Sequence, residues 1–378
     1  MPIGSDLILD GTCETYLSLK SYAVDTFYDF GPYNVENKDA IYVIGRMQFL
    51  KNTVKIRDLI ESGVRIVYSN PFEGSETIRN HLIRLGFEDI ALAKKLLIIS
   101  GGDLEPGWPY MLYDHFLPKV HNFTENLEQC ARVEEIYSVD PKPYKFLFLN
   151  GRARSHRKWL VERFAHTGVL DSSIWSLLDP NGGISRGLQL TVDGEDLMSR
   201  GRPVRLLDSK YEVDRYHDHL SITTTEFAKY ELFNNEWGDI YLKAEPYIDT
   251  YFSVVTETVF EYPYSFRTEK IWKPIAIGHP WIVAANYGYY RDLRKLGFKT
   301  FDHLIDESFD LIENNNDRIV RIAETVEDLC KSGASEFLQA AKDICKYNQQ
   351  HLWTIRGPVQ QEFTGNFFNF LKDNKWMI

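Results

Sequence analysis

The sequence predicts an α/β protein of two domains, each built on a parallel sheet that helices cover on both faces. The chain has 378 residues, which is too long for one compact core. Short apolar segments alternate with helical ones, as in parallel sheets. A proline-rich segment at 140–143 precedes a second series of the same kind. We therefore expect domains at 1–139 and 140–345, and a helical segment at 346–378 that packs back across both.

Turn residues delimit the elements of the first half. Gly45 ends an apolar strand, Gly63 stops a helix, and Ser75 is a suitable N-cap for the next helix. Strands are predicted at 40–44, 64–68 and 95–100, and helices at 53–62 and 76–85.

The second half restarts with an apolar strand and a basic helix. The glycine-containing stretch 171–250 shows few clear periods. Strands are predicted at 144–150, 251–255 and 281–285, and helices at 155–164, 268–277, 317–332 and 361–376.

Composition narrows the classes of function. The net charge of −11 leaves no broad basic surface, which argues against a dedicated nucleic-acid-binding protein. The four cysteines form no C-x-x-C pair, so free thiols in a reducing compartment are expected. Neither a signal peptide nor a membrane span is recognisable, and we expect a cytoplasmic protein, in the host cytoplasm if it is viral.

Each half is Rossmann-like, and ligands of such sheets bind at the carboxyl ends of the strands. The loop after 144–150 reads GRARSHRK and brings Arg152, Arg154 and Arg157 to the start of a helix. A helix N-terminus already favours anions, so these arginines suit a bound diphosphate. The alternative is a solvated basic helix end.

Two further loops carry polar residues after the strand at 251–255. One contains Glu257, and the other reads RTEK from Arg267. Thr268 can cap the following helix, with Glu269 in its first turn and Lys270 and Lys273 on one face. A carboxylate beside lysines suits a nucleoside diphosphate, although a capped surface helix accounts for the same pattern.

The segments FSVVTET (252–258), RTEKIWK (267–273) and GHPWIV (278–283) resemble the donor-binding segment of α1,3-fucosyltransferases. The resemblance covers about 35 residues and departs from the family at Thr258, usually Asn, and at Pro274. It implies a GT-B fold, two Rossmann-like domains facing a central cleft, with the nucleotide sugar bound mainly by the second. The stretches 296–302 and 306–310 also look like uncharacterised glycosyltransferases of phages and large viruses.

The resemblance also implies roles for single residues. Glu269 looks like the ribose-binding glutamate, and Lys270 like the diphosphate-binding lysine. Glu257 looks like the glutamate before the donor loop, and we expect it to bind the donor together with Thr268 and Lys273. An arginine that holds diphosphate could be Arg152 or Arg154.

An inverting transferase needs a carboxylate that deprotonates the acceptor hydroxyl. Asp103 and Glu105 follow the strand at 95–100, and Glu73 follows the strand at 64–68. All three are candidates for the catalytic base, and Trp108 could stack on an acceptor ring. Local caps or turns explain each acid equally well.

Other sequence patterns give weaker indications of function. His217 and His219 lack the further ligands that a metal site needs, and no strict Asp-x-Asp occurs. The glycine patterns of dehydrogenases and P-loop NTPases are absent. We expect no metal and no cofactor beyond the donor substrate.

The leading hypothesis is an inverting, metal-independent glycosyltransferase that moves a sugar from a nucleoside-diphosphate sugar to a hydroxyl of a glycan or similar acceptor. Two alternatives remain. One is a viral transferase that glycosylates hydroxymethylated bases in DNA. We favour modified DNA less as the acceptor than a glycan. The other is a non-catalytic protein that binds nucleotides or glycans.

Overall fold

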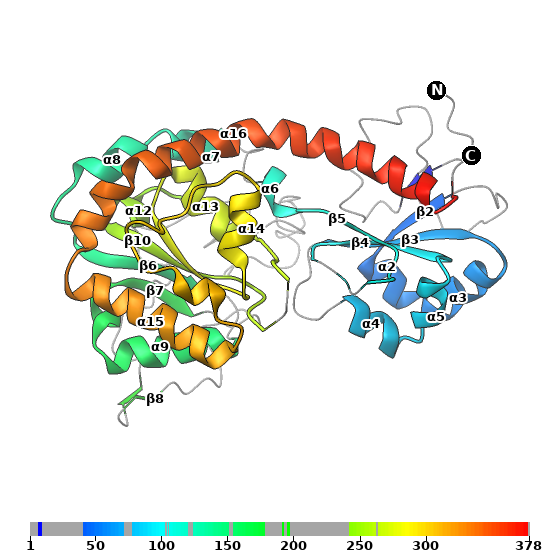
Figure 1. The fold of residues 1–378 in the computed structure, drawn as a ribbon, viewed down its shortest axis with the longest axis horizontal. Helices are drawn as coiled ribbons and strands as arrows, with labels where there is room; N and C mark the ends of the chain where they lie inside the picture. Colours follow the sequence, from blue (N-terminus) through cyan, green and yellow to red (C-terminus); the bar gives the residue numbers. More distant parts are fainter. Residues whose placement is uncertain are drawn as a thin grey trace, which may run out of the picture. The chain divides into compact units, whose positions relative to one another are not determined.

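The protein has an α/β fold with two parallel sheets, as predicted, consistent with two Rossmann-like units (Figure 1). The structure, a computed structural model, describes residues 7–9, 41–71, 78–102, 104, 106–119, 124–150, 154–177, 191–192, 195–196, 242–261 and 264–376. The chain forms two compact units. The first comprises Met1–His115 and Ile355–Ile378, and the second comprises Phe116–Thr354.

The first unit is built on a five-stranded parallel sheet in the order β1-β2-β3-β4-β5. Its strands are β1 (Leu7–Leu9), β2 (Ile41–Gly45), β3 (Arg65–Asn70), β4 (Leu96–Ser100) and β5 (Tyr110–Leu112). Its helices are α2 (Arg46–Lys51), α3 (Thr53–Glu61), α4 (Ile78–Arg84), α5 (Glu88–Leu92) and the last part of α16 (Ala334–Asp373).

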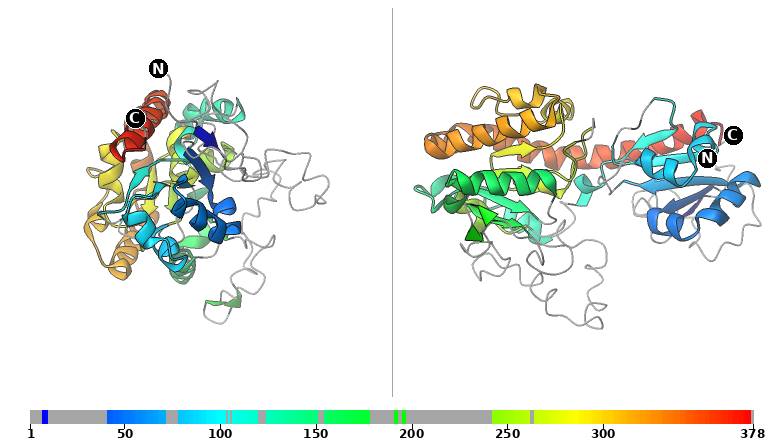
Figure 2. Two further views of the ribbon diagram at one scale, coloured as in Figure 1. Left: turned by 90° about the vertical axis from the view of Figure 1, so that its right-hand side faces the viewer. Right: turned by 90° about the horizontal axis from the view of Figure 1, so that it is seen from below.

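The two faces of this sheet are covered in different ways. The strands of this sheet lie side by side in the order in which they occur in the chain. Right-handed crossovers between such strands place the connecting helices on one face of the sheet. Helices α2 to α5 lie on that face (Figures 1 and 2). The opposite face, with Val43, Val67 and Leu97, packs against Phe367 and Leu371 of α16. The end of α16 thus completes the core of the first unit.

The second unit contains a four-stranded parallel sheet in the order β11-β10-β6-β7. Its strands are β6 (Tyr144–Asn150), β7 (Ile174–Leu177), β10 (Thr250–Thr256) and β11 (Trp281–Ala284), with a separate β8 (Thr191–Val192) and β9 (Glu195–Asp196) ribbon. Its helices are α6 (Phe116–Lys119), α7 (Thr124–Cys130), α8 (Val133–Ser138), α9 (Ser155–His166), η1 (Val169–Ser172), α12 (Glu245–Ile248), α13 (Glu269–Ile277), α14 (Tyr289–Lys295), η3 (Ser308–Leu311), α15 (Asn315–Lys331) and the first part of α16.

Strand order reverses between β6 and β10. From β6 the chain passes through α9 to β7 on one side, and β10 and β11 then add on the other side. Phe164 of α9 packs on Phe146 and Phe148 of β6, and α15 contacts α9 on the same face (Figure 1). The reversal is a topological switch point, where open parallel sheets bind ligands.

The boundary between the two units does not fall at the linker that we expected. Helices α7 and α8 precede residue 140 but belong to the second unit. Tyr137 of α8 donates a hydrogen bond to the carbonyl of Gly278, and Arg132 pairs with Glu245. Because these contacts join residues more than 100 positions apart, the linker composition does not reveal the boundary. Helix α16 begins earlier than the predicted 361 and contributes to both units.

Gly278 ends α13 in the left-handed region at φ 75°, and its N–H and that of His279 bond to the carbonyls of Ile275 and Pro274. A Cβ on Gly278 would lie 2.6 Å from Cγ2 of Val133. We expect Gly278→Ala to lower the free energy of unfolding by about 3 kcal/mol, since left-handed strain and overpacking add. Urea denaturation measures this.

Gly168 provides the matched control. It has φ 77°, and no atom lies within 4 Å of the position its Cβ would take. Gly168→Ala should therefore cost only the backbone strain, about 1 kcal/mol. Equal losses in the two variants would contradict the packing argument at Gly278.

Among the described residues we find no helix with the length and apolar character that a bilayer crossing requires.

Candidate functional site

The candidate site lies at the carboxyl ends of β6 and β10, where the strand order reverses. Asn150 ends β6 and Thr256 ends β10. Both are 1% exposed, and the Thr256 hydroxyl donates to Oδ1 of Asn150. Helices α9 and α13 start from this edge, so two helix N-termini lie here.

The start of α13 is capped as the sequence predicts. Oγ1 of Thr268 accepts a hydrogen bond from the backbone N–H of Lys270, at 3.3 Å. Glu269 stands in the first turn, where a negative charge is favourable toward the helix dipole. The RTEK segment is therefore a capped helix start located at the switch point.

Lys270 forms the centre of a partly open polar group. Its ammonium donates to Oε1 of Glu269 at 2.6 Å, to Oγ1 of Thr268 at 3.1 Å and to Oγ1 of Thr258 at 3.5 Å. The side chains of Lys270 and Glu269 retain 22% and 16% exposure. Burial alone would raise the pKa of Glu269, but the charges of Lys270 and Lys273 bring it below its usual value. Glu269 is thus an ionised acceptor within reach of solvent.

Glu257 is buried inside the protein, whereas we expected its side chain to contact a ligand. Its side chain is 0% exposed, and its carboxylate accepts hydrogen bonds from Thr258, Thr268 and Tyr289. Burial raises its pKa, which the charge of Lys270 and the bonds from Thr268 oppose. Glu257 supports the site from within the protein.

The side chains of Arg157 and His156 at the start of α9 also point into the protein. Arg157 is 2% exposed, and its Nη2 donates to the carbonyls of Thr256 at 2.9 Å and Glu257 at 3.2 Å. His156 stacks on Phe260, and its Nε2 lies 3.0 Å from the same Glu257 carbonyl. Arg157 therefore holds the end of β10, which differs from the diphosphate contact we expected of it.

Positive charges from the two helix starts converge near His156. Burial is the main reason that the pKa of His156 falls to about 3, and the charges of Arg157, Arg154 and Lys270 lower it further. The imidazole is therefore neutral, and its Nε2–H donates to the carbonyl of Glu257. Arg154, at the N-cap position of α9, is partly exposed beside this group.

Other predicted residues fall elsewhere. Asp103, Glu105, Glu73 and Arg152 lie outside the described residues. Trp108, which we expected to stack on an acceptor, is 7% exposed and packs into the core beside α2 to α5. Lys273 is partly buried near Glu269. His217 and His219 are also outside the described ranges.

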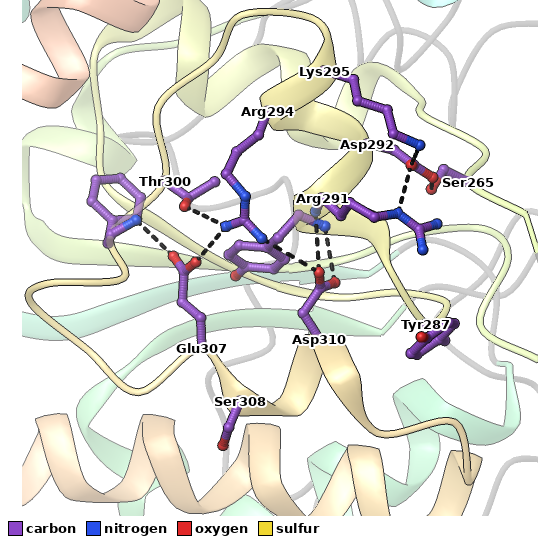
Figure 3. A network of polar contacts seen from close by, with 12 residues as sticks. Ser265, Tyr287, Arg291, Asp292, Arg294, Lys295, Thr300, Glu307, Ser308 and Asp310 are labelled. Atoms are coloured by element: carbon purple, nitrogen blue, oxygen red, sulfur yellow. Dashed lines mark hydrogen bonds and ion pairs between the residues drawn. The ribbon is translucent and has the colours of Figure 1, made fainter.

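A second polar network lies around α14 (Figure 3). The Asp310 carboxylate accepts from the N–H groups of Tyr290 and Arg291 at the start of α14. Glu307 accepts from Arg294 and from the N–H of Phe301, and burial raises its pKa to about 6. Main-chain N–H groups and Arg294 contact both carboxylates. The network therefore holds the loop between α14 and α15 in place.

This network also supports the candidate site. Ser265, in the loop between β10 and α13, donates to Oδ2 of Asp292 at 2.7 Å (Figure 3). Asn286 in turn donates weakly to Ser265. The loop that leads to Thr268 is thereby fixed against α14.

Three participants were not identified from the sequence. Asn150, His156 and Tyr289 are joined to the site only by contacts with residues 32 to 106 positions away. The position of Asn150 at a strand end was a usable signal. For Tyr289, the only signal in the sequence was its position shortly after the strand at 281–284.

Comparison with family models, with curated proteins and with solved structures finds no match. Within the described ranges, no three His, Cys, Asp or Glu side chains gather in a way that could hold a metal ion.

Proposed function

We propose that this protein is an inverting glycosyltransferase of the GT-B plan that uses a nucleoside-diphosphate sugar, and that the second unit binds the nucleotide. The observation that carries the proposal is the convergence of two helix starts and the charges of Arg154 and Lys270 at the switch point of the second sheet. Helix N-termini and cationic side chains together favour a diphosphate.

The polar group around Lys270 supports separate contacts to the two parts of such a donor. The ionised Glu269 can accept from ribose hydroxyls, and the ammonium of Lys270 can exchange its present acceptors for phosphate oxygens. Both side chains are partly exposed, so a ligand can reach them.

The proposed reaction needs charge stabilisation on the leaving group. The acceptor oxygen attacks the anomeric carbon, the bond from that carbon to the diphosphate oxygen breaks, and a carboxylate takes the acceptor proton. Lys270 and Arg154 offset the charge that develops on the diphosphate, a role that a metal ion serves in other transferases. Asp103, Glu105 and Glu73 remain the candidates for the base.

A thermal-shift screen with GDP-, UDP-, CMP- and dTDP-sugars tests the proposal, followed by calorimetry with the best nucleotide. We expect Lys270→Ala to weaken nucleotide binding by about 10- to 100-fold, since a hydrogen bond to a charged group contributes about 1.5–3 kcal/mol. Glu269→Ala should weaken binding of the nucleotide while leaving the affinity for inorganic pyrophosphate nearly unchanged.

Lys331→Ala is the control, because Lys331 is an exposed lysine of the same unit that pairs with Asp328 on α15. Its nucleotide affinity should equal that of the wild type. Nucleotide binding that survives both Lys270→Ala and Glu269→Ala unchanged would refute the assignment of this site.

A further inference from the structure

A single buried carboxylate organises the loop that presents Lys270. Oε1 of Glu257 accepts from the N–H of Thr268 at 3.0 Å and from the hydroxyl of Tyr289 at 2.8 Å. Oε2 accepts from the hydroxyl of Thr268 at 2.7 Å and from the N–H of Thr258 at 3.3 Å. The side chain is 0% exposed, so every partner belongs to the protein and a ligand has no access to it.

Three of these four bonds join the two ends of one loop, and the fourth ties the carboxylate to Tyr289 of α14. Thr258 is the second residue after β10, next to Glu257 itself, and Thr268 is the last residue before α13. Oγ1 of Thr268, having donated its proton to Glu257, accepts from the backbone N–H and from the ammonium of Lys270. The orientation of the ammonium therefore depends on Glu257 through Thr268.

We infer that Glu257 is a positioning residue, which fixes Thr268 and through it directs the ammonium of Lys270 toward a bound diphosphate. The inference rests on the proposed function for its ligand, but the contacts that carry it are internal to the protein. It replaces the direct donor contact that the sequence suggested for Glu257.

The arrangement requires a carboxylate and not merely a polar side chain. Both oxygens face a backbone N–H, which cannot turn to accept. An amide at this position has one oxygen and one NH₂ group, so in either orientation its NH₂ meets a backbone donor. Glu257→Gln should consequently release one end of the loop while keeping the size of the side chain.

A double-mutant cycle on the full-length protein tests the inference, with inorganic pyrophosphate as the calorimetric probe. We expect Glu257→Gln to weaken pyrophosphate binding about tenfold in the wild type and to have no further effect in Lys270→Ala, because Glu257 acts through Lys270. An equal loss in both backgrounds would overturn the inference.

Glu327→Gln is the matched control for a general loss of stability. Glu327 is another buried carboxylate of this unit, 5% exposed, and it pairs with Arg163 away from the loop. The control should unfold more easily than the wild type yet bind pyrophosphate with unchanged affinity. If Glu257→Gln does not fold, Thr268→Val takes its place in the cycle, since it removes the hydroxyl that joins Glu257 to Lys270.

A ligand-free measurement separates this inference from the proposed function. After ¹³C-methylation of the lysines, the methyl resonance of Lys270, assigned by its absence in Lys270→Ala, is compared between variants at one pH. Its chemical shift should change in Glu257→Gln and stay the same in Glu327→Gln, because only the first variant releases Thr268, which holds the ammonium. An unchanged resonance in Glu257→Gln would overturn the positioning role. Failure of the wild type to bind any nucleotide or pyrophosphate would instead overturn the proposed function alone.

Discussion

Arg318→Met should lower the free energy of unfolding by about 3–5 kcal/mol, the largest loss we expect from a single substitution. Arg318 lies on α15 and is 1% exposed. Its guanidinium donates five hydrogen bonds, to Ala285 O, Ile312 O, Glu313 O, Phe260 O and Asn315 Oδ1.

These bonds fix the loops that surround the candidate site. The Phe260 carbonyl lies in the loop after β10, and the Ala285 carbonyl follows β11. Methionine fills much of the volume but provides no donor, so these buried carbonyls lose their partner, at about 1–3 kcal/mol each. The guanidinium also lies 4.5 Å from the Phe260 ring centre, a cation–π contact that methionine loses.

Urea denaturation monitored by circular dichroism measures the loss. Arg321→Met is the control, because Arg321 is on the same helix but pairs with Asp306 and Glu324 on the surface. We expect this control to lose less than about 1 kcal/mol. Similar losses in the two variants would show that the buried bonds of Arg318 contribute little.

Acidification should destabilise the protein through two buried histidines. The pKa values of His156 and His279 fall from 6.5 to about 3, chiefly because burial penalises the charged imidazole. His279 is 0% exposed, with one nitrogen 2.9 Å from the Thr250 carbonyl and the other 2.9 Å from the Ser253 hydroxyl. Both histidines are therefore held in the neutral form.

The direction of the effect follows from proton binding. Below pH 6.5 the unfolded chain takes up protons on these histidines while the folded protein does not, so stability is lost as the pH falls from 6.5 toward 3. Each histidine should account for about 2 kcal/mol between pH 7 and pH 5. Glu307, whose pKa is raised to about 6, acts in the opposite direction as the pH falls from 6 toward 4.5.

A comparison of variants isolates the histidine contribution from that of Glu307. Between pH 7 and pH 5, His279→Gln should lose about 2 kcal/mol less unfolding free energy than the wild type loses. His303→Gln, at a largely exposed ring beside Asp302, should follow the wild type. A His279→Gln profile parallel to that of the wild type would contradict this account.

The sequence predicted much of the local structure near the site. The strand at 144–150 and the helix that begins after Thr268 were predicted within one residue, and the strands at 250–256 and 281–284 were found in place. These elements are recognisable because apolar periodicity, glycine stops and a Thr cap act over a few neighbouring residues.

The sequence could not reveal which way the polar side chains point. Arg157 and Glu257 were expected to bind a ligand, and both are turned into the protein by partners distant in the chain. A basic residue at a helix start has the same local pattern whether it meets solvent or a carbonyl of another strand. Burial by distant segments decides between the two.

The RTEK segment and its strand context were thus determined by the sequence itself, since a cap and a first-turn acid need only adjacent residues. The tertiary structure alone decided that β6 and β10 lie side by side, that Glu257 closes the loop before Thr268, and that the end of α16 completes the first unit. Each of these depends on pairing or packing between residues far apart in sequence, which no local pattern encodes.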